Sequence, residues 1–222
     1  MMAAADGLRI VIRGRQTHGA VPWGGVDPIV VASQVVLGLQ TIASRQINIT
    51  TGPAIITIGS IQGGNRGNII PDSVVMLGTV RTFDEAMRTD IKRRIARTAE
   101  SIAESAGATA MVEYVSPSYP VTINNPALTA RMLPTLRRVA GDANVRVSEL
   151  SMPAEDFSYY QQKVPGMFLF LGVTPKGQDP AAAAKNHSPS FFADEAALPV
   201  GVKTLAMLAL DWLASNPAPA KP

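Results

Sequence analysis

The strongest constraint on the fold of this chain is the order in which two residue periodicities follow one another between residues 8 and 115. Alternating or β-branched apolar runs indicate strands, and apolar residues that recur at helical spacing indicate helices. Strand patterns cover Leu8–Arg13, Ala54–Ile61, Ser73–Phe83 and Thr109–Val115, and helix patterns cover Asp27–Ser44 and Asp84–Gly107. The order of elements is therefore β-α-β-β-α-β.

This order predicts an α+β fold, a split β-α-β-β-α-β sandwich with one antiparallel sheet and two helices on one face. Both helices begin at a residue type suited to the N-cap. Asp27 precedes a proline at the first helical position, and Asp84 precedes the second helix. We expect the sandwich to form a first domain over residues 7–117, ending in the proline-containing stretch Ser116–Pro120.

A second domain is expected over residues 118–216, followed by a frayed tail at residues 217–222. Helices are predicted at Pro126–Val139, Ala154–Gln161 and Asp194–Ala214, a short strand at Val145–Glu149 and a buried strand at Met167–Gly172. Two short strands and three helices make a poor core on their own. We therefore expect this segment to be the C-terminal part of a larger α/β catalytic domain whose first part is missing.

Composition excludes several classes of protein. With 46% hydrophobic and 17% charged residues, the 222-residue chain has an ordinary globular composition. A net charge of +3 is too small to indicate nucleic-acid binding, and the absence of cysteine excludes disulfides and thiolate metal sites. No apolar run approaches the ~18 residues of a membrane span. No secretory signal is visible at the start, so we expect a cytoplasmic protein, although a truncated start would have lost such a signal.

The only two histidines of the chain lie in loop-like motifs, His18 in Thr17–Pro22 and His187 in Asn186–Pro189. Imidazole is the commonest metal ligand in proteins. However, no cluster of His, Asp, Glu or Cys in the sequence has the spacing of a complete metal site. From the residues alone, His187 is more often an exposed loop histidine than a ligand. The structural alternative for His18 is a turn histidine at a strand end, favoured by Gly19 and Pro22.

A series of short motifs runs in order along nearly the whole chain. The motifs are Ala3–Asp6, Gly14–Ala20, Val26–Pro28, Gly63–Gly64, Asn68–Asp72, Gly78–Arg81, Glu155–Phe157, Leu171–Gly172 and Asn186–Pro189. Together they resemble the zinc-peptidase and amidohydrolase family, which includes aminoacylases, hippurate hydrolases, indole-acetyl-amino-acid hydrolases and related carboxypeptidases. The motifs up to Arg81 resemble the lid, or dimerisation, domain, and the last three resemble the C-terminal part of the catalytic domain.

The resemblance implies a homodimeric two-domain enzyme with two divalent metal ions (zinc, manganese or cobalt) that cuts the amide between an acyl group and an amino acid. It implies that His187 is the last metal ligand. It also implies that His18 reaches the partner's active site and polarises the scissile carbonyl as an oxyanion donor. Asn68 and Arg81 resemble the lid residues that hold the substrate's carboxylate or carbonyl. The family's first segment, which supplies the other metal ligands and a Glu-Glu pair, is absent here.

Three of these residues also have a purely structural interpretation. Arg81 suits a carboxylate because a guanidinium donates two parallel hydrogen bonds. A strand-end arginine paired with Asp84 or Glu85 is the alternative. Glu155 and Asp156 either orient a metal ligand or favour the dipole at the start of a helix.

Three functions therefore remain open. The first is a metal-dependent amidohydrolase or peptidase acting on N-acyl amino acids or small peptides, present as an incomplete chain that is inactive alone. The second is a non-catalytic dimerisation module, because the edge strands and a helix of a sandwich can pair with a second copy. The third, a metal-independent serine esterase, ranks lowest because the sequence has no Gly-x-Ser-x-Gly elbow. Expected partners are a second copy and a small substrate, with neither nucleic acid nor membrane.

Overall fold

The computed structural model describes residues 1–216, which form two compact units. The first unit comprises Met1–Ile123 together with Glu149–Lys163. The second comprises Asn124–Ser148 and the residues from Val164 onward. The predicted domains over residues 7–117 and 118–216 stay a prediction, and the predicted tail at residues 217–222 lies outside the described residues.

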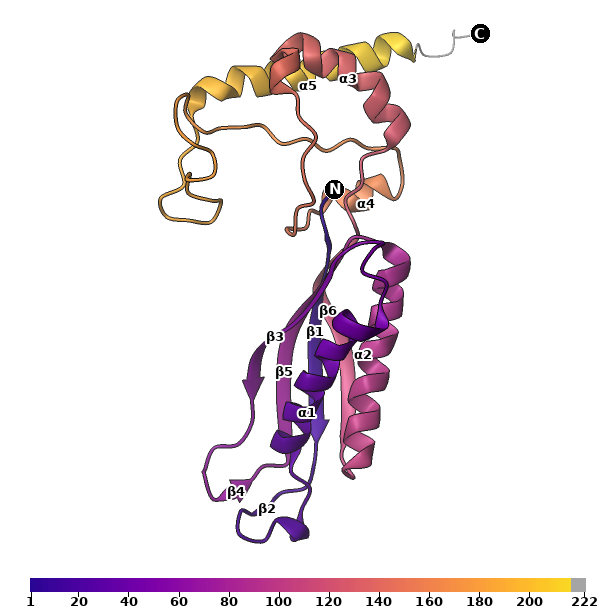
Figure 1. Cartoon of the computed structure of the whole chain (residues 1–222), viewed down its shortest axis with the longest axis vertical. Coiled ribbons are helices and arrows are strands. Elements are labelled where there is room, and N and C mark those ends of the chain that lie inside the picture. Colours follow the sequence, from indigo (N-terminus) through magenta and orange to yellow (C-terminus); the bar gives the residue numbers. More distant parts are fainter. Residues whose placement is uncertain (217–222) are drawn as a thin grey trace, which may run out of the picture. The chain divides into compact units, whose positions relative to one another are not determined.

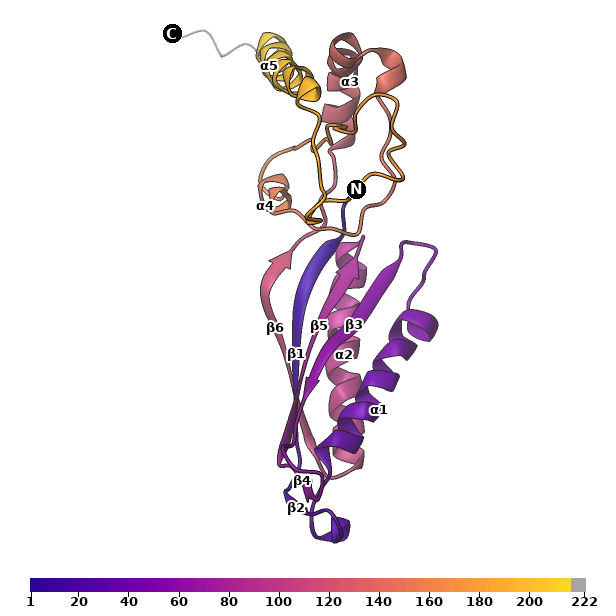
Figure 2. The ribbon, with the colours of Figure 1, turned by 90° about the vertical axis from the view of Figure 1, so that its left-hand side faces the viewer.

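The first unit is built on a four-stranded antiparallel sheet in the order β3-β5-β1-β6 (Figures 1 and 2). Its strands are β1 (Ala4–Arg13), β3 (Ala54–Gln62), β5 (Ser73–Thr82) and β6 (Thr109–Tyr119). The helices α1 (Pro28–Thr41) and α2 (Glu85–Ser105) pack against this sheet, and a π-helical turn at Ile42–Gln46 extends α1. A two-stranded sheet joins β2 (Thr17–His18) to β4 (Ile69–Ile70). The predicted α+β fold with an antiparallel sheet is confirmed.

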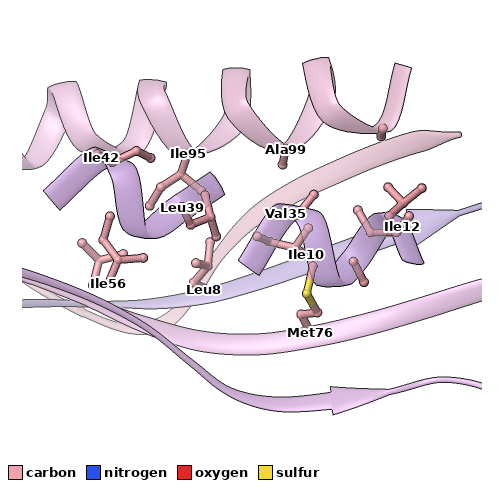
Figure 3. Close-up of a cluster of buried hydrophobic side chains, with 14 of the residues drawn as sticks. Leu8, Ile10, Ile12, Val35, Leu39, Ile42, Ile56, Met76, Ile95 and Ala99 are labelled. Atoms are coloured by element: carbon pink, nitrogen blue, oxygen red, sulfur yellow. The ribbon is translucent and has the colours of Figure 1, made fainter. Parts of the chain in front are cut away.

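The core lies between the sheet and the two helices because each element presents apolar residues on one face. On β1, Leu8, Ile10 and Ile12 are buried at alternate positions, as the period of a strand requires. They meet α1 residues Val35 and Leu39 (Figure 3). Burying an aliphatic side chain contributes about 1.5 to 3 kcal/mol, so this cluster is the main source of stability for the first unit.

The helix starts follow the predicted caps. The carboxylate of Asp27 accepts hydrogen bonds from the backbone N–H groups of Ile29 and Val30 at 2.9 and 3.4 Å. Asp84 accepts one from the N–H of Met87 at 2.6 Å. Each side chain satisfies donors that the first turn of a helix leaves without a partner.

A buried ion network fixes the end of the sheet where β1 begins. Asp6 is only 1% exposed, and its carboxylate accepts hydrogen bonds from Arg88 Nε at 2.7 Å, Lys92 Nζ at 2.7 Å and Ser118 Oγ at 2.5 Å. Burial disfavours the charge, but these donors and the charge of Arg88 outweigh it and lower the pKa of Asp6 to about 2. Through these bonds to Asp6 the network joins β1, α2 and β6. Arg88 also bonds Glu85 within α2.

The second unit contains two long helices, α3 (Pro126–Ala140) and α5 (Leu198–Ser215), which contact each other. The short helix α4 (Phe157–Gln161) belongs to the first unit. The remaining described elements are 3-10 turns at Pro22–Gly24, Asp142–Asn144 and Glu195–Ala197.

The strands predicted at Val145–Glu149 and Met167–Gly172 are wrong, because neither segment forms a strand. A strand exists only when its backbone pairs with a neighbour. Within residues 1–216, neither run lies in a sheet. Val147, near the middle of the first run, is 99% exposed. Local residue pattern favoured extended chain at both places, but no strand lies alongside to pair with it.

The stretch Glu195–Ser215 is the one helical segment among the described residues that is long and apolar enough to cross a membrane, with a mean hydropathy of 1.4. Lys203 and Asp211 interrupt it, so the sequence contains no continuous apolar run of that length. Asp211 accepts hydrogen bonds from Thr135 and Arg138 on α3. Only 6% of the apolar window is buried within the described residues, and a single such helix is weak evidence for a membrane protein.

The Asp6 network generates a prediction about stability. Asp6→Asn leaves Arg88 and Lys92 facing a neutral amide, and removing one partner of a buried ion pair costs about 3 to 5 kcal/mol. The lowered pKa means that the stabilisation by Asp6 is complete above pH 4 and is lost as the pH falls towards 2. Urea unfolding followed by circular dichroism should therefore show a large deficit for the variant at pH 7 that shrinks at pH 2.

Asp90→Asn is the matched control for this experiment. Asp90 pairs with Arg93 and Arg94 on the outer face of α2, where water screens the charges. Its loss should be much smaller than that of Asp6→Asn at pH 7. A deficit for Asp6→Asn that is the same at every pH would contradict the assigned role of the charge.

Candidate functional site

His18 lies in a tight turn at the end of the first unit where β2 pairs with β4. The backbone N–H of Ala20 donates a hydrogen bond to His18 Nδ1 at 3.0 Å, and the N–H of Val21 donates to the carbonyl of His18 at 2.8 Å. Because Nδ1 accepts, a neutral His18 carries its proton on Nε2. The turn therefore holds an exposed imidazole with an N–H donor available to a ligand.

Asn68 lies beside this turn. His18 pairs with Ile69 in the small sheet, and the N–H of Gly19 donates to the carbonyl of Asn68 at 2.8 Å. A Cβ on residue 19 would come within 3.1 Å of that carbonyl oxygen, so the close approach of the two loops favours glycine. The side chain of Asn68 is exposed and makes no hydrogen bond within the described chain. The structure thus brings two of the predicted site residues together.

Trp23 lies in the same turn and was not among the residues selected from the sequence. It is 81% exposed, in the 3-10 turn Pro22–Gly24 that follows His18. An indole ring so exposed is uncommon in a folded protein. The signal available in the sequence was an aromatic residue between a proline and a glycine, next to a motif histidine.

Arg81 lies far from His18 and Asn68. It is near the end of β5, where it pairs with Ala5 of β1 and Ile55 of β3. Arg81 lies eight residue steps along β5 from Ser73, which is about 26 Å at the rise of a β-strand. One small substrate therefore cannot contact Arg81 and His18 of the same chain.

Arg81 does not pair with Asp84 or Glu85, which was the structural alternative. Asp84 caps α2, and Glu85 bonds Arg88 and the N–H of Val121. Arg81 is half-buried and makes no ion pair with any residue in the described range. A guanidinium without a counter-ion at a strand end is suited to a ligand carboxylate.

His187 lies in the second unit, in the exposed loop before α5. Its φ of 70° makes it the single non-glycine residue in the left-handed region among residues 1–216. Histidine is enriched in that region relative to most residues, but a non-glycine residue with this backbone merits attention. The side chain is exposed and bonds no other described group.

Glu155 and Asp156 precede α4 in the first unit. The carbonyl of Glu155 accepts from Ser158, and the N-cap residue Asp156 makes no capping hydrogen bond through its side chain. Among the described residues, neither carboxylate takes part in a side-chain ion pair or capping hydrogen bond. The described residues contain no group of three or more His, Cys, Asp or Glu side chains that could hold a metal ion. The residues present do not form a complete metal site.

Comparison with known proteins connects these residues to a family. The family model described as peptidase family M20/M25/M40 matches residues 7–211. Thermostable carboxypeptidase 2 of Saccharolobus solfataricus is 36% identical over 96% of this chain and 52% of its own length. N-acetyl-L-cysteine deacetylase of Bacillus subtilis is 39% identical over 89% of this chain and 45% of its own. IAA-amino acid hydrolase ILR1-like 4 of Arabidopsis thaliana is 33% identical over 96% and 48%.

Solved structures agree with these sequence matches. A structure from Staphylococcus aureus superposes with a TM-score of 0.81 at 28% identity, covering 96% of this chain and 53% of that protein. A Bacillus subtilis protein described as a dinuclear metal binding peptidase of the M20 family superposes with a TM-score of 0.71 at 30% identity, covering 96% and 51%. The chain spans about half the length of the curated relatives it matches. The resemblance read from the motifs is confirmed: the chain belongs to peptidase family M20/M25/M40.

Proposed function

We propose that this chain supplies the lid and the C-terminal part of the catalytic domain of a cytoplasmic metal-dependent amidohydrolase. The enzyme hydrolyses the amide bond of N-acyl amino acids or small peptides. The observation that carries the proposal is the set of relatives named for a carboxypeptidase, a deacetylase and an amino acid conjugate hydrolase, which match between 89% and 96% of the chain. The lid corresponds to residues 7–117 and the catalytic part to residues 118–216.

The turn at the tip of the lid supports a role for His18 in polarising the scissile carbonyl. Its Nε2 donor is exposed, and Ala20 fixes the tautomer. A positioned neutral donor of this kind stabilises the negative charge that develops on a carbonyl oxygen during attack. Asn68 lies next to it and adds a second amide donor. Arg81, without a counter-ion, binds the carboxylate of the substrate through two parallel hydrogen bonds.

The distance between Arg81 and His18 supports a site shared by two chains. Since about 26 Å of strand separates Arg81 from Ser73, at the end of β5 nearer to His18, a substrate held by Arg81 of one protomer receives His18 and Asn68 from another. A homodimer satisfies this requirement because the turn with His18 and Asn68 of each protomer can then reach the site of the other. In a single chain, a substrate bound to Arg81 would have no contact with His18 and Asn68.

The edge strand β3 and the adjacent helix α1 are the surface through which we expect the chains to pair. The other edge strand, β6, carries Glu113 in an ion pair with Arg9, whereas β3 contains no charged residue. An edge strand without charged side chains can pair through its free backbone groups with a strand of another chain. Apolar side chains on the outer surface of β3 and α1 are exposed, namely Ile29, Val30, Leu37, Ile55 and Ile61.

For the metal ions, the chain contributes His187. Its imidazole is exposed in a loop where its backbone has a positive φ. In the first unit, Asp156 makes no capping hydrogen bond, so Glu155 and Asp156 are separate candidates for orienting a ligand of the complete enzyme. Two divalent ions, zinc, manganese or cobalt, need more donors than this. A single imidazole holds metal weakly, so the other donors come from the remaining half of the enzyme.

The first prediction concerns turnover. The purified chain with added zinc or manganese should hydrolyse none of a panel of N-acetyl-, N-benzoyl- and indole-acetyl-amino acids above background, because its described residues hold no complete metal site. Joined to the remaining half of N-acetyl-L-cysteine deacetylase, it should become active, and a chelator or His187→Ala should abolish that activity. A folded, metal-loaded fusion that hydrolyses no member of the panel would refute the proposed function.

The second prediction tests the shared site by subunit mixing in that fusion. His18→Ala should lower kcat about 10²- to 10³-fold, as loss of an oxyanion donor does, without changing the metal content. His187→Ala should be inactive for loss of metal. A mixture of the two inactive variants should recover about a quarter of the wild-type activity, because mixed dimers contain one complete site. No recovery after subunit exchange would show that His18 acts within its own chain.

The third prediction concerns assembly of the chain itself. Light scattering should give the mass of a dimer, and Leu37→Lys should give a monomer because it places a charge in the pairing surface. Leu37 is 72% exposed, so the change does not disturb the core. Val147→Lys, at a residue 99% exposed in the second unit, is the matched control and should leave the dimer intact. A wild-type chain that is monomeric at every concentration would exclude this surface.

A further inference from the structure

A hollow of about 500 Å³ lies in the first unit where β3 ends and β5 begins. The connection after β1 and the loop between β3 and β4 form its sides. Its lining includes an arginine, an aspartate, three primary amides and a small apolar group, named here the amino-acid hollow: Gln16, Gln62, Asn65, Arg66, Ile69, Pro71, Asp72 and Val75.

The polar side chains of the amino-acid hollow are not engaged by the protein. Arg66 makes no ion pair, and the side-chain amides of Gln16, Gln62 and Asn65 make no hydrogen bond, within residues 1–216. The carboxylate of Asp72 accepts a single hydrogen bond, from Ser73 Oγ at 2.8 Å. Each amide keeps both its carbonyl acceptor and its N–H donors for a ligand.

Arg66 and Asp72 line the same hollow without pairing with each other. Opposite charges within 4 Å would form an ion pair, and none joins these two residues. A ligand that carries both a negative and a positive group can bridge this gap with two charge-assisted hydrogen bonds.

We propose that the amino-acid hollow binds a free α-amino acid with an aliphatic side chain. The α-carboxylate bonds Arg66, the α-ammonium bonds Asp72, and the side chain packs on Ile69, Pro71 and Val75. The amides at the rim complete the hydrogen bonds of the two charged groups. The assignment rests on the charges of the hollow. Only its link to catalysis rests on the proposed function, since a free amino acid is the product which that reaction would release.

The test uses the whole purified chain, with chelator present so that no turnover occurs. L-leucine, N-acetyl-L-leucine and L-leucinamide are titrated and binding is followed by NMR, which measures weak affinities at open sites. N-acetyl-L-leucine lacks the ammonium and L-leucinamide lacks the carboxylate. Because water screens charges at this exposed site, loss of one charged hydrogen bond should weaken binding severalfold. L-leucine should therefore bind severalfold more tightly than either analogue. Glycine should bind more weakly than leucine because it lacks the aliphatic group.

Two variants locate the binding. Arg66→Gln and Asp72→Asn should each lower the affinity for L-leucine severalfold. Both residues are exposed, so neither change threatens the fold. Arg97→Gln is the matched control, at an exposed α2 arginine outside the hollow that bonds no described residue, and it should leave the affinity unchanged.

Three results would overturn the proposal. They are no saturable shifts with L-leucine, equal affinity for N-acetyl-L-leucine, or an unchanged affinity in Arg66→Gln. These results are distinguishable from failure of the proposed function. If L-leucine binds but the fused enzyme hydrolyses nothing, the amino-acid hollow stands and the catalytic proposal falls. If the fused enzyme is active but L-leucine does not bind, only the hollow is refuted.

Discussion

Pairing of β1 on both of its edges is the constraint on which the rest of the first unit depends. Its backbone bonds β5 along one side and β6 along the other, and its alternate side chains fill the space under α1 and α2. A carboxylate buried on such a strand is stable only with cations, and α2 supplies them in Arg88 and Lys92. After Arg13, the N–H of Gly14 bonds the carbonyl of Asp72. The central strand therefore positions both the helix layer and the turn that carries His18.

Much of this fold was predictable because its signals are local. Alternation in Leu8–Arg13 and the N-cap at Asp27 each depend on residues close in sequence, and both appear as predicted. The failed strand at Met167–Gly172 depended on something that its own residues do not encode, namely a neighbour to pair with. Asp6 is a second example of a feature that local sequence does not encode. Nothing near it reveals burial, because its cationic partner Arg88 lies 82 positions away.

The candidate site divides in the same way. Motif residues such as His18, Asn68 and Arg81 could be selected from the sequence, but their grouping could not. The structure joins His18 to Asn68 through a two-residue ladder too short to leave a periodic pattern. It places Arg81 at the opposite end of β5, which follows only from the register of the sheet. Asp72 stood in the motif Asn68–Asp72 but was not selected as a site residue, and Arg66 gave no signal, since a polar residue between strands looks like any loop residue.

The two ends of the stretch Met1–Ile123 of the first unit are joined by backbone hydrogen bonds. The N–H of Met2 donates to the carbonyl of Thr122 at 3.0 Å, and the N–H of Thr122 returns a bond to Met2 at 3.1 Å. A domain whose ends meet can be inserted into a surface loop of another fold without forcing the flanking segments apart. Because its two ends meet, this sheet-and-helix unit can stand within a larger fold while its flanking segments leave side by side.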